Sequence, residues 1–99
     1  MQQFAVTHRH PALPGHFPGH PVVPGVVLIS EILKAAAADW PALQISGIRK
    51  LKFVRQVLPD QPVDINWRAR GDGGLAFTLA VAGNTVAQGR LDTAPVNSA

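Results

Sequence analysis

The feature that most constrains the fold is a run of prolines between residues 11 and 24. Prolines stand at positions 11, 14, 18, 21 and 24. Each of them fixes φ and removes a backbone donor, which excludes both a helix and an interior strand. Residues 10–24 are therefore predicted to form a loop, and its segment PGHFPGHPVVPG (14–25) holds two histidines in a stiff backbone.

A proline-free apolar stretch follows this loop and predicts one helix. Gly25–Asp39, GVVLISEILKAAAAD, contains four alanines, which are strong helix formers. Pro24 suits a helix entrance, and Pro41 comes just past the end. The polar positions and one alanine share a face within about 100° of a helical wheel: Ser30, Glu31, Lys34 and Ala38. We therefore expect a largely buried helix with one narrow polar stripe.

The remaining segments have the pattern of strands. A short first strand is predicted at 3–9, and alternating apolar and polar residues predict four more strands. Their ranges are 43–57, 62–70, 75–82 and 85–94. Turn residues between these four predict three antiparallel hairpin connections. The fold class is thus α+β, a single domain over residues 1–99, with about five strands curled around one long central helix.

Composition indicates an oligomer. Of the 99 residues, 46% are hydrophobic and only 15% are charged, so charge does not cover the surface of so small a domain. Apolar area is then exposed or paired with another subunit. The absence of cysteine excludes a disulfide framework, a thiolate metal site and a cysteine nucleophile.

The charge pattern indicates a mild attraction to acidic partners. The net charge is +3, and five of the nine basic residues fall between positions 49 and 68. Charged residues of a half-exposed sheet often only face water. These basic residues therefore either meet an acidic partner or are simply solvated. Nucleic acid, an anionic membrane and an acidic protein are partners of this kind, and of these we expect only the protein. The start MQQFAVTHRH lacks the pattern of a leader, so we expect the cytoplasm.

The motifs resemble a known family. The run GHFPG (15–19), then Pro21, then Pro24 and Gly25 opening an apolar helix, resembles the signature of the β-hydroxyacyl-ACP dehydratases, which have the hot-dog fold. KFVRQVLPD (52–60) extends the resemblance. It implies removal of water from a 3-hydroxyacyl thioester on acyl carrier protein or coenzyme A. The product is a trans-2-enoyl thioester for fatty-acid, aryl-polyene or polyketide-type lipid synthesis, and no cofactor is expected.

The resemblance also implies roles for particular residues. His16 matches the family's catalytic histidine, and imidazole suits proton transfer near neutral pH. Gly25 matches the helix-initial glycine, whose N–H faces the thioester carbonyl with no side chain expected in the way. The expected acyl pocket is lined by Phe17, Val23, Val26 and Ile29. The residues expected to face the acidic carrier protein are Arg49, Lys50, Lys52 and Arg55.

The chain departs from the family at the catalytic acid. The family's helix carboxylate falls at Ser30, and Glu31 comes one residue later, about 100° and ~1.5 Å away. Three alternatives stay open: Glu31 acts through an altered helix start, Ser30 holds a water that acts, or the protein mainly binds acyl chains. Glu31 is equally suited to an ordinary ion pair with Lys34. Because the family's carboxylate comes from a second subunit, the resemblance implies a homodimer with a shared site.

Two other functions compete with dehydration. Hot-dog proteins also include thioesterases, although these generally lack the HFPG loop, and the serine at position 30 favours a non-catalytic acyl-binding or assembly subunit. The pair His8 and His10, with His16 and His20 nearby, resembles a metal site, because imidazole is a common zinc ligand. No known ligand spacing supports it, and we expect no metal.

Overall fold

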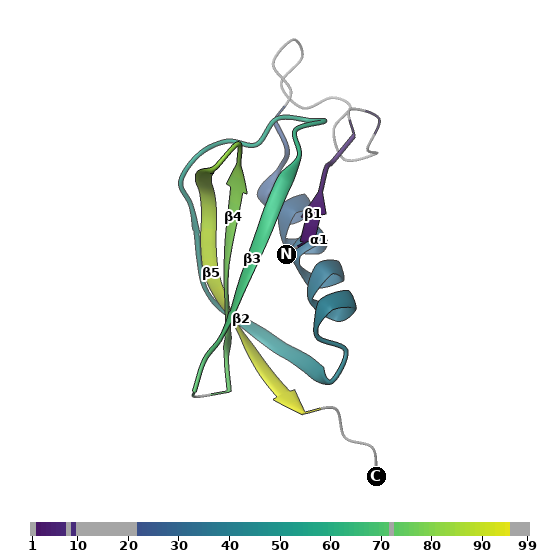
Figure 1. The fold of residues 1–99 in the computed structure, drawn as a ribbon. Coiled ribbons are helices and arrows are strands. Elements are labelled where there is room, and N and C mark those ends of the chain that lie inside the picture. The colour runs from purple at the N-terminus through teal and green to yellow at the C-terminus, as the bar shows by residue number, and fades with distance from the viewer. Residues whose placement is uncertain (1, 8, 10–21, 72, 96–99) are drawn as a thin grey trace.

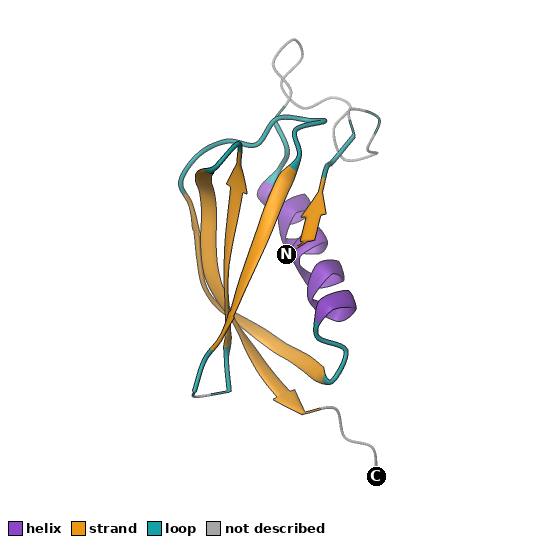
Figure 2. Ribbon diagram, viewed as in Figure 1, coloured by secondary structure: helices purple, strands orange, loops and turns teal. Residues whose placement is uncertain are grey.

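The order of elements agrees with the sequence prediction: one strand, one helix, then four strands (Figure 1). The structure is a computed structural model that describes residues 2–7, 9, 22–71 and 73–95. The elements are β1 (Gln2–Phe4), α1 (Gly25–Asp39), β2 (Leu43–Phe53), β3 (Val63–Ala69), β4 (Leu75–Val81) and β5 (Asn84–Pro95). The strands form one antiparallel sheet, and α1 lies along one of its faces (Figure 2).

The helix has the bounds that the prolines and alanines predict. Pro24 is extended, with φ −62° and ψ 148°, and stands just before the first turn. After the last turn, the Trp40 N–H donates to the carbonyl oxygen of Ala36 at 2.8 Å. The side chains buried against the sheet are Val27, Leu28, Ile32, Ala35 and Ala36.

The prediction of a largely buried helix is wrong for the single chain. Val26 is 72% exposed, and Leu33 on the same side of α1 is exposed as well. One sheet covers only one side of a helix, so the opposite side stays open and carries apolar as well as polar residues. This face is wider than the predicted polar stripe.

The sheet order corrects one predicted connection. The order is β1-β3-β4-β5-β2, so β2 pairs with β5 and not with its neighbour in sequence, β3. Residues 54–62 cross between these strands instead of forming a hairpin, because the connection is anchored in the core: Val57 is buried and its carbonyl oxygen accepts from the Val23 N–H at 2.8 Å. The hairpins β3–β4 and β4–β5 agree with the prediction.

Two strands differ in length from the prediction. The first is Gln2–Phe4 instead of 3–9, and β2 ends at Phe53 instead of residue 57.

The part of the chain that the structure describes contains no helix with the length and apolarity to cross a membrane.

Candidate active site

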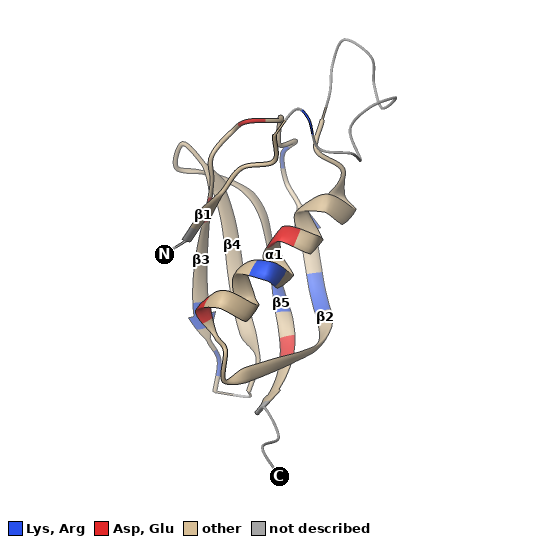
Figure 3. Ribbon diagram, turned by 90° about the vertical axis from the view of Figure 1, so that its right-hand side faces the viewer, with Lys and Arg blue, Asp and Glu red and all other residues tan. Residues whose placement is uncertain are grey.

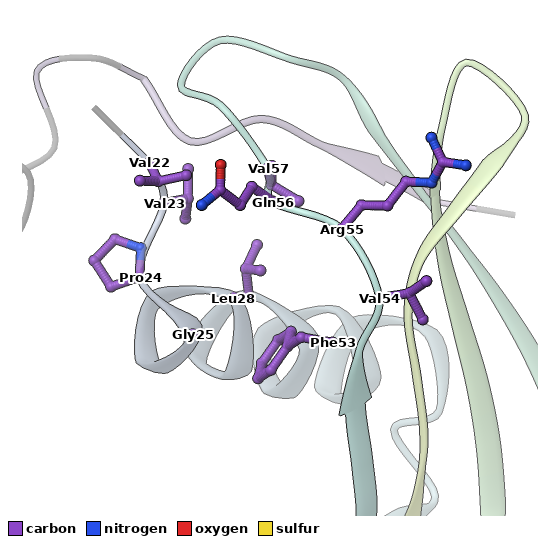
Figure 4. Close-up of a pocket in the computed structure, with 10 residues that line it drawn as sticks. All are labelled: Val22, Val23, Pro24, Gly25, Leu28, Phe53, Val54, Arg55, Gln56 and Val57. Atoms are coloured by element: carbon purple, nitrogen blue, oxygen red, sulfur yellow. The ribbon is translucent and has the colours of Figure 1, made fainter. Parts of the chain in front are cut away.

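A largely apolar pocket lies where α1 begins and β2 ends (Figure 4). Its volume is about 390 Å³, within the range of about 300–1,000 Å³ that is usual for small-molecule sites. It is lined by Val22, Val23, Pro24, Gly25, Leu28, Phe53, Val54, Arg55, Gln56 and Val57. The polar side chains among them are Arg55 and Gln56, so the pocket suits an apolar group with a polar end.

The start of α1 offers backbone donors to this pocket. The N–H groups of Val27 and Leu28 donate to the carbonyl oxygen of Pro24, at 3.0 and 3.3 Å. Within the described ranges, no residue supplies an acceptor for the N–H groups of Gly25 and Val26, and no side chain caps the helix. Two adjacent donors at the positive end of the helix dipole therefore stay available for a carbonyl oxygen.

The side chain of Phe53 lies beside Gly25, which the sequence did not predict. A Cβ atom built on Gly25 would lie 3.1 Å from both Cε2 and Cζ of Phe53. The ring thus packs against the bare face of the glycine, because β2 ends there with Phe53 directed toward the helix (Figure 4). An alanine at position 25 would require the ring to shift by a few tenths of an ångström.

The predicted acyl-pocket residues are only partly found together. Val23 is buried and lines the pocket, whereas Val26 and Ile29 are not among the lining residues. His16 and Phe17 lie outside the described residues. The sequence prediction missed the walls formed by Leu28, Phe53 and Val57. The resemblance of residues 52–60 to the family was the available signal, but that segment was interpreted as a strand and turn.

The two candidate acids lie on α1, away from the pocket of their own chain. The carboxylate Oε1 of Glu31 is 3.6 Å from Nζ of Lys34, the ordinary pair that their spacing predicts. Figure 3 shows acidic and basic positions along α1. The Glu31 side chain is 21% exposed, whereas Ser30 lies on the open side of the helix. Neither residue lines the pocket, so a single chain does not bring an acid to the Gly25 N–H.

The four residues expected to face a carrier protein are not one patch. Nε of Arg49 is 2.9 Å from Oδ1 of Asp92. Lys50 and Lys52 flank Leu51, which packs against the core, so they point to the outer face of the sheet. Arg55 is the member of this set that lines the pocket.

The residues that the structure describes do not support a metal site. They contain no group of three or more histidine and acidic side chains placed to hold an ion. His8, His10 and His20 lie outside those residues.

Known proteins with similar sequences are dehydratases. The 3-hydroxyacyl-(acyl-carrier-protein) dehydratase FabZ of Desulforamulus reducens is 36% identical over 93 residues, which cover 83% of this chain and 66% of the relative. The chain thus spans about two thirds of the length of that relative.

Similar solved structures share the hot-dog fold. The dehydratase heterocomplex ApeI:P from Xenorhabdus doucetiae has a TM-score of 0.77 and 24% identity, covering 92% of this chain and 82% of that one. A thioesterase from Thermus thermophilus, complexed with coenzyme A and zinc, has a TM-score of 0.63 and 18% identity, covering 97% and 79%. These likenesses confirm the predicted fold.

A match to a protein-family model is more specific evidence than a shared fold. The model described as ApeI-like, ApeI dehydratase, matches residues 1–90. This match covers the proline-rich segment of the sequence, the helix, strands β1 to β4 and the first half of β5. The chain belongs to the ApeI-like dehydratase family.

Proposed function

We propose that this chain is a hydro-lyase that removes water from a 3-hydroxyacyl thioester and leaves the trans-2-enoyl thioester. The thioester is carried by acyl carrier protein or coenzyme A, in fatty-acid, aryl-polyene or polyketide-type lipid synthesis. Family membership and the FabZ relative support this reaction. The structural observation that carries it is the available N–H group of Gly25, which lines an apolar pocket at the start of α1.

The reaction needs a base, a donor and an acid. His16 takes a proton from C2, and negative charge develops on the thioester oxygen. The Gly25 N–H donates to that oxygen at the positive end of α1, which stabilises the charge. The hydroxyl at C3 then departs with a proton from the acid, which forms water and the C2–C3 double bond. The acid is Glu31, or a water held by Ser30.

The acid in this proposal comes from a second subunit. Both candidate acids lie away from the pocket of their own chain, and the outer side of α1 carries exposed Val26 and Leu33. β2 has one edge without a strand partner among the described residues. These features support a homodimer. The Xenorhabdus neighbour is a heterocomplex, so a second, non-identical dehydratase subunit is the other partner to test.

The carrier protein is proposed to dock beside the pocket. Arg55 lines the pocket wall and would meet an acidic surface there, while Arg49, Lys50 and Lys52 add positive charge further along β2. We retain the cytoplasm as the proposed location, which cell fractionation would test.

Incubation of the protein with a 3-hydroxyacyl-ACP tests the proposal. We expect 2-enoyl-ACP by mass spectrometry, and no product from His16→Ala. Glu31→Gln and Ser30→Ala then identify the acid, since the variant that lowers the rate of elimination carries the role. Release of free acid and carrier thiol would instead indicate a thioesterase. Binding of acyl-ACP without any turnover would indicate the non-catalytic subunit.

A further inference from the structure

The side chain of Phe53 occupies the space next to the proposed oxyanion donor. Its ring carbons lie 3.1 Å from the position of a Cβ on Gly25. The amide nitrogen and that Cβ position are both bonded to the same Cα, so the ring comes within about 6 Å of the Gly25 nitrogen. The ring is therefore a wall of the place where the thioester carbonyl would be held.

Standard bond lengths give the distance of the acyl carbons from the Gly25 nitrogen. A carbonyl oxygen accepts from an N–H at about 2.9 Å. The carbonyl carbon is then about 1.2 Å further on, and C2 of the acyl group is one bond of about 1.5 Å beyond it. C2 is thus at about the same distance from the Gly25 nitrogen as the ring, inside the pocket that Gly25 and Phe53 both line. A substituent on C2 that points toward this wall of the pocket would therefore meet Phe53.

We propose that Phe53 determines specificity at C2 of the acyl group, by excluding substrates that carry a branch there. The inference rests on the proposed function, because it takes the Gly25 N–H as the thioester donor. The ring is 44% exposed and stands at the last residue of β2. It is bounded by Gly25 on one side, so a methyl group at C2 competes with the ring for the same volume, whereas an unbranched chain passes beside it.

The protein should therefore distinguish an unbranched 3-hydroxyacyl thioester from one with a methyl group at C2. One methyl group in an apolar pocket usually changes discrimination by about 10- to 200-fold. We expect the wild-type protein to prefer the unbranched substrate over its 2-methyl analogue by at least about tenfold in kcat/KM. Phe53→Ala should reduce this preference by about tenfold, through a gain on the branched substrate.

Binding measurements separate this inference from the reaction itself. The ligands are two stable amide analogues of 3-hydroxyacyl-pantetheine, one unbranched and one 2-methyl, and calorimetry gives the Kd of each. We expect wild type to bind the unbranched analogue at least about tenfold more tightly, Phe53→Ala to bind both alike, and Phe53→Leu to fall between them. Val54→Ala is the matched control, since Val54 also lines the pocket but is not among the atoms nearest Gly25.

The outcomes are distinct. Discrimination in binding without turnover of either thioester would support the role of Phe53 and overturn the proposed dehydration. Turnover with equal preference for both substrates in the wild type would overturn the role of Phe53 and leave dehydration in place. An equal effect of Val54→Ala and Phe53→Ala would also overturn it, because the pocket would then respond to any lost volume.

Discussion

Gly89, in the middle of β5, has no room for a side chain. A Cβ atom there would overlap the carbonyl oxygen of Lys50 and lie 2.8 Å from Cζ of Phe77. Phe77 is buried in the core and packs over the glycine from β4, with which Gly89 is in register. The missing side chain therefore leaves room for the ring of Phe77.

Gly89→Ala should destabilise the protein through overpacking. Extra methyl groups in a well-packed core typically cost about 1–3 kcal/mol, and the obstacle here includes backbone, which yields less than a side chain. Urea denaturation measures the change in the free energy of unfolding. Gly71→Ala is the control, because a Cβ at Gly71 meets nothing within 4 Å, and its effect should stay within about 0.5 kcal/mol. Similar losses for both variants would contradict the packing argument.

Gly25 and Phe53 are coupled by the same kind of contact at the active site. Gly25→Ala should slow dehydration, because the new methyl group would stand 3.1 Å from the ring of Phe53 and force this wall of the pocket to shift. In Gly25→Ala/Phe53→Ala that obstacle is gone, so the second substitution should restore part of the rate. A double-mutant cycle in kcat/KM measures the coupling. Additive losses would mean that the methyl group acts on the N–H directly and not through Phe53.

At the scale of elements, one side-chain contact ties the end of α1 to the sheet. Nε1 of Trp67, on β3, donates to Oδ2 of Asp39, the last residue of the helix, at 2.7 Å. The ring of Trp67 also meets Phe77 edge to face, with centroids 6.3 Å apart. Trp40, which follows Asp39, differs from Trp67 in this respect. Its Nε1 is buried and has no acceptor among the described residues.

Trp67→Phe should cost more stability than Trp40→Phe. Both changes remove similar aromatic volume, but only the first removes a hydrogen bond, whose net contribution is about 0.5–1.5 kcal/mol. Trp40→Phe also removes a buried donor that lacks a partner, which offsets part of the lost packing. Chemical denaturation of the two variants gives the difference. Equal costs would show that the Asp39 contact adds nothing to the anchoring of the helix.

The elements differ in how far sequence alone could predict them. The helix was predicted at its observed bounds because Pro24, Pro41 and the alanines act locally. The pairing of β2 with β5 was missed, since the rule that successive strands form hairpins ignores the anchoring of Val57 in the core. The Gly25 donor was predicted from the motif, but the Phe53 wall depends on a contact between residues far apart in sequence.

At the scale of the whole molecule, a single chain leaves much apolar surface open. Among the residues that the structure describes, six large hydrophobic side chains are exposed: Val26, Leu33, Ile48, Phe53, Val54 and Leu58. Two of them are on the outer side of α1, and the others are on β2 and the segment that follows it. Since α1 and β2 contact each other, these residues belong to neighbouring parts of the surface. Apolar surface of this kind marks a protein–protein contact, which agrees with the dimer proposed for completing the site.

Leu33→Glu should dissociate that dimer without unfolding the chain. Leu33 is exposed in the single chain, so the new carboxylate costs little in the monomer, whereas in the interface it would be buried without a partner. Light scattering should then report a mass near 10.5 kDa, with loss of dehydration because the acid of the second subunit is missing. Ala38→Glu adds the same charge at an exposed position five residues further along α1, on its predicted polar stripe, and should remain dimeric and active. A wild-type monomer, or a Leu33→Glu variant that stays dimeric, would mean that the open side of α1 is not the contact. An active Leu33→Glu monomer would mean that each chain supplies its own acid.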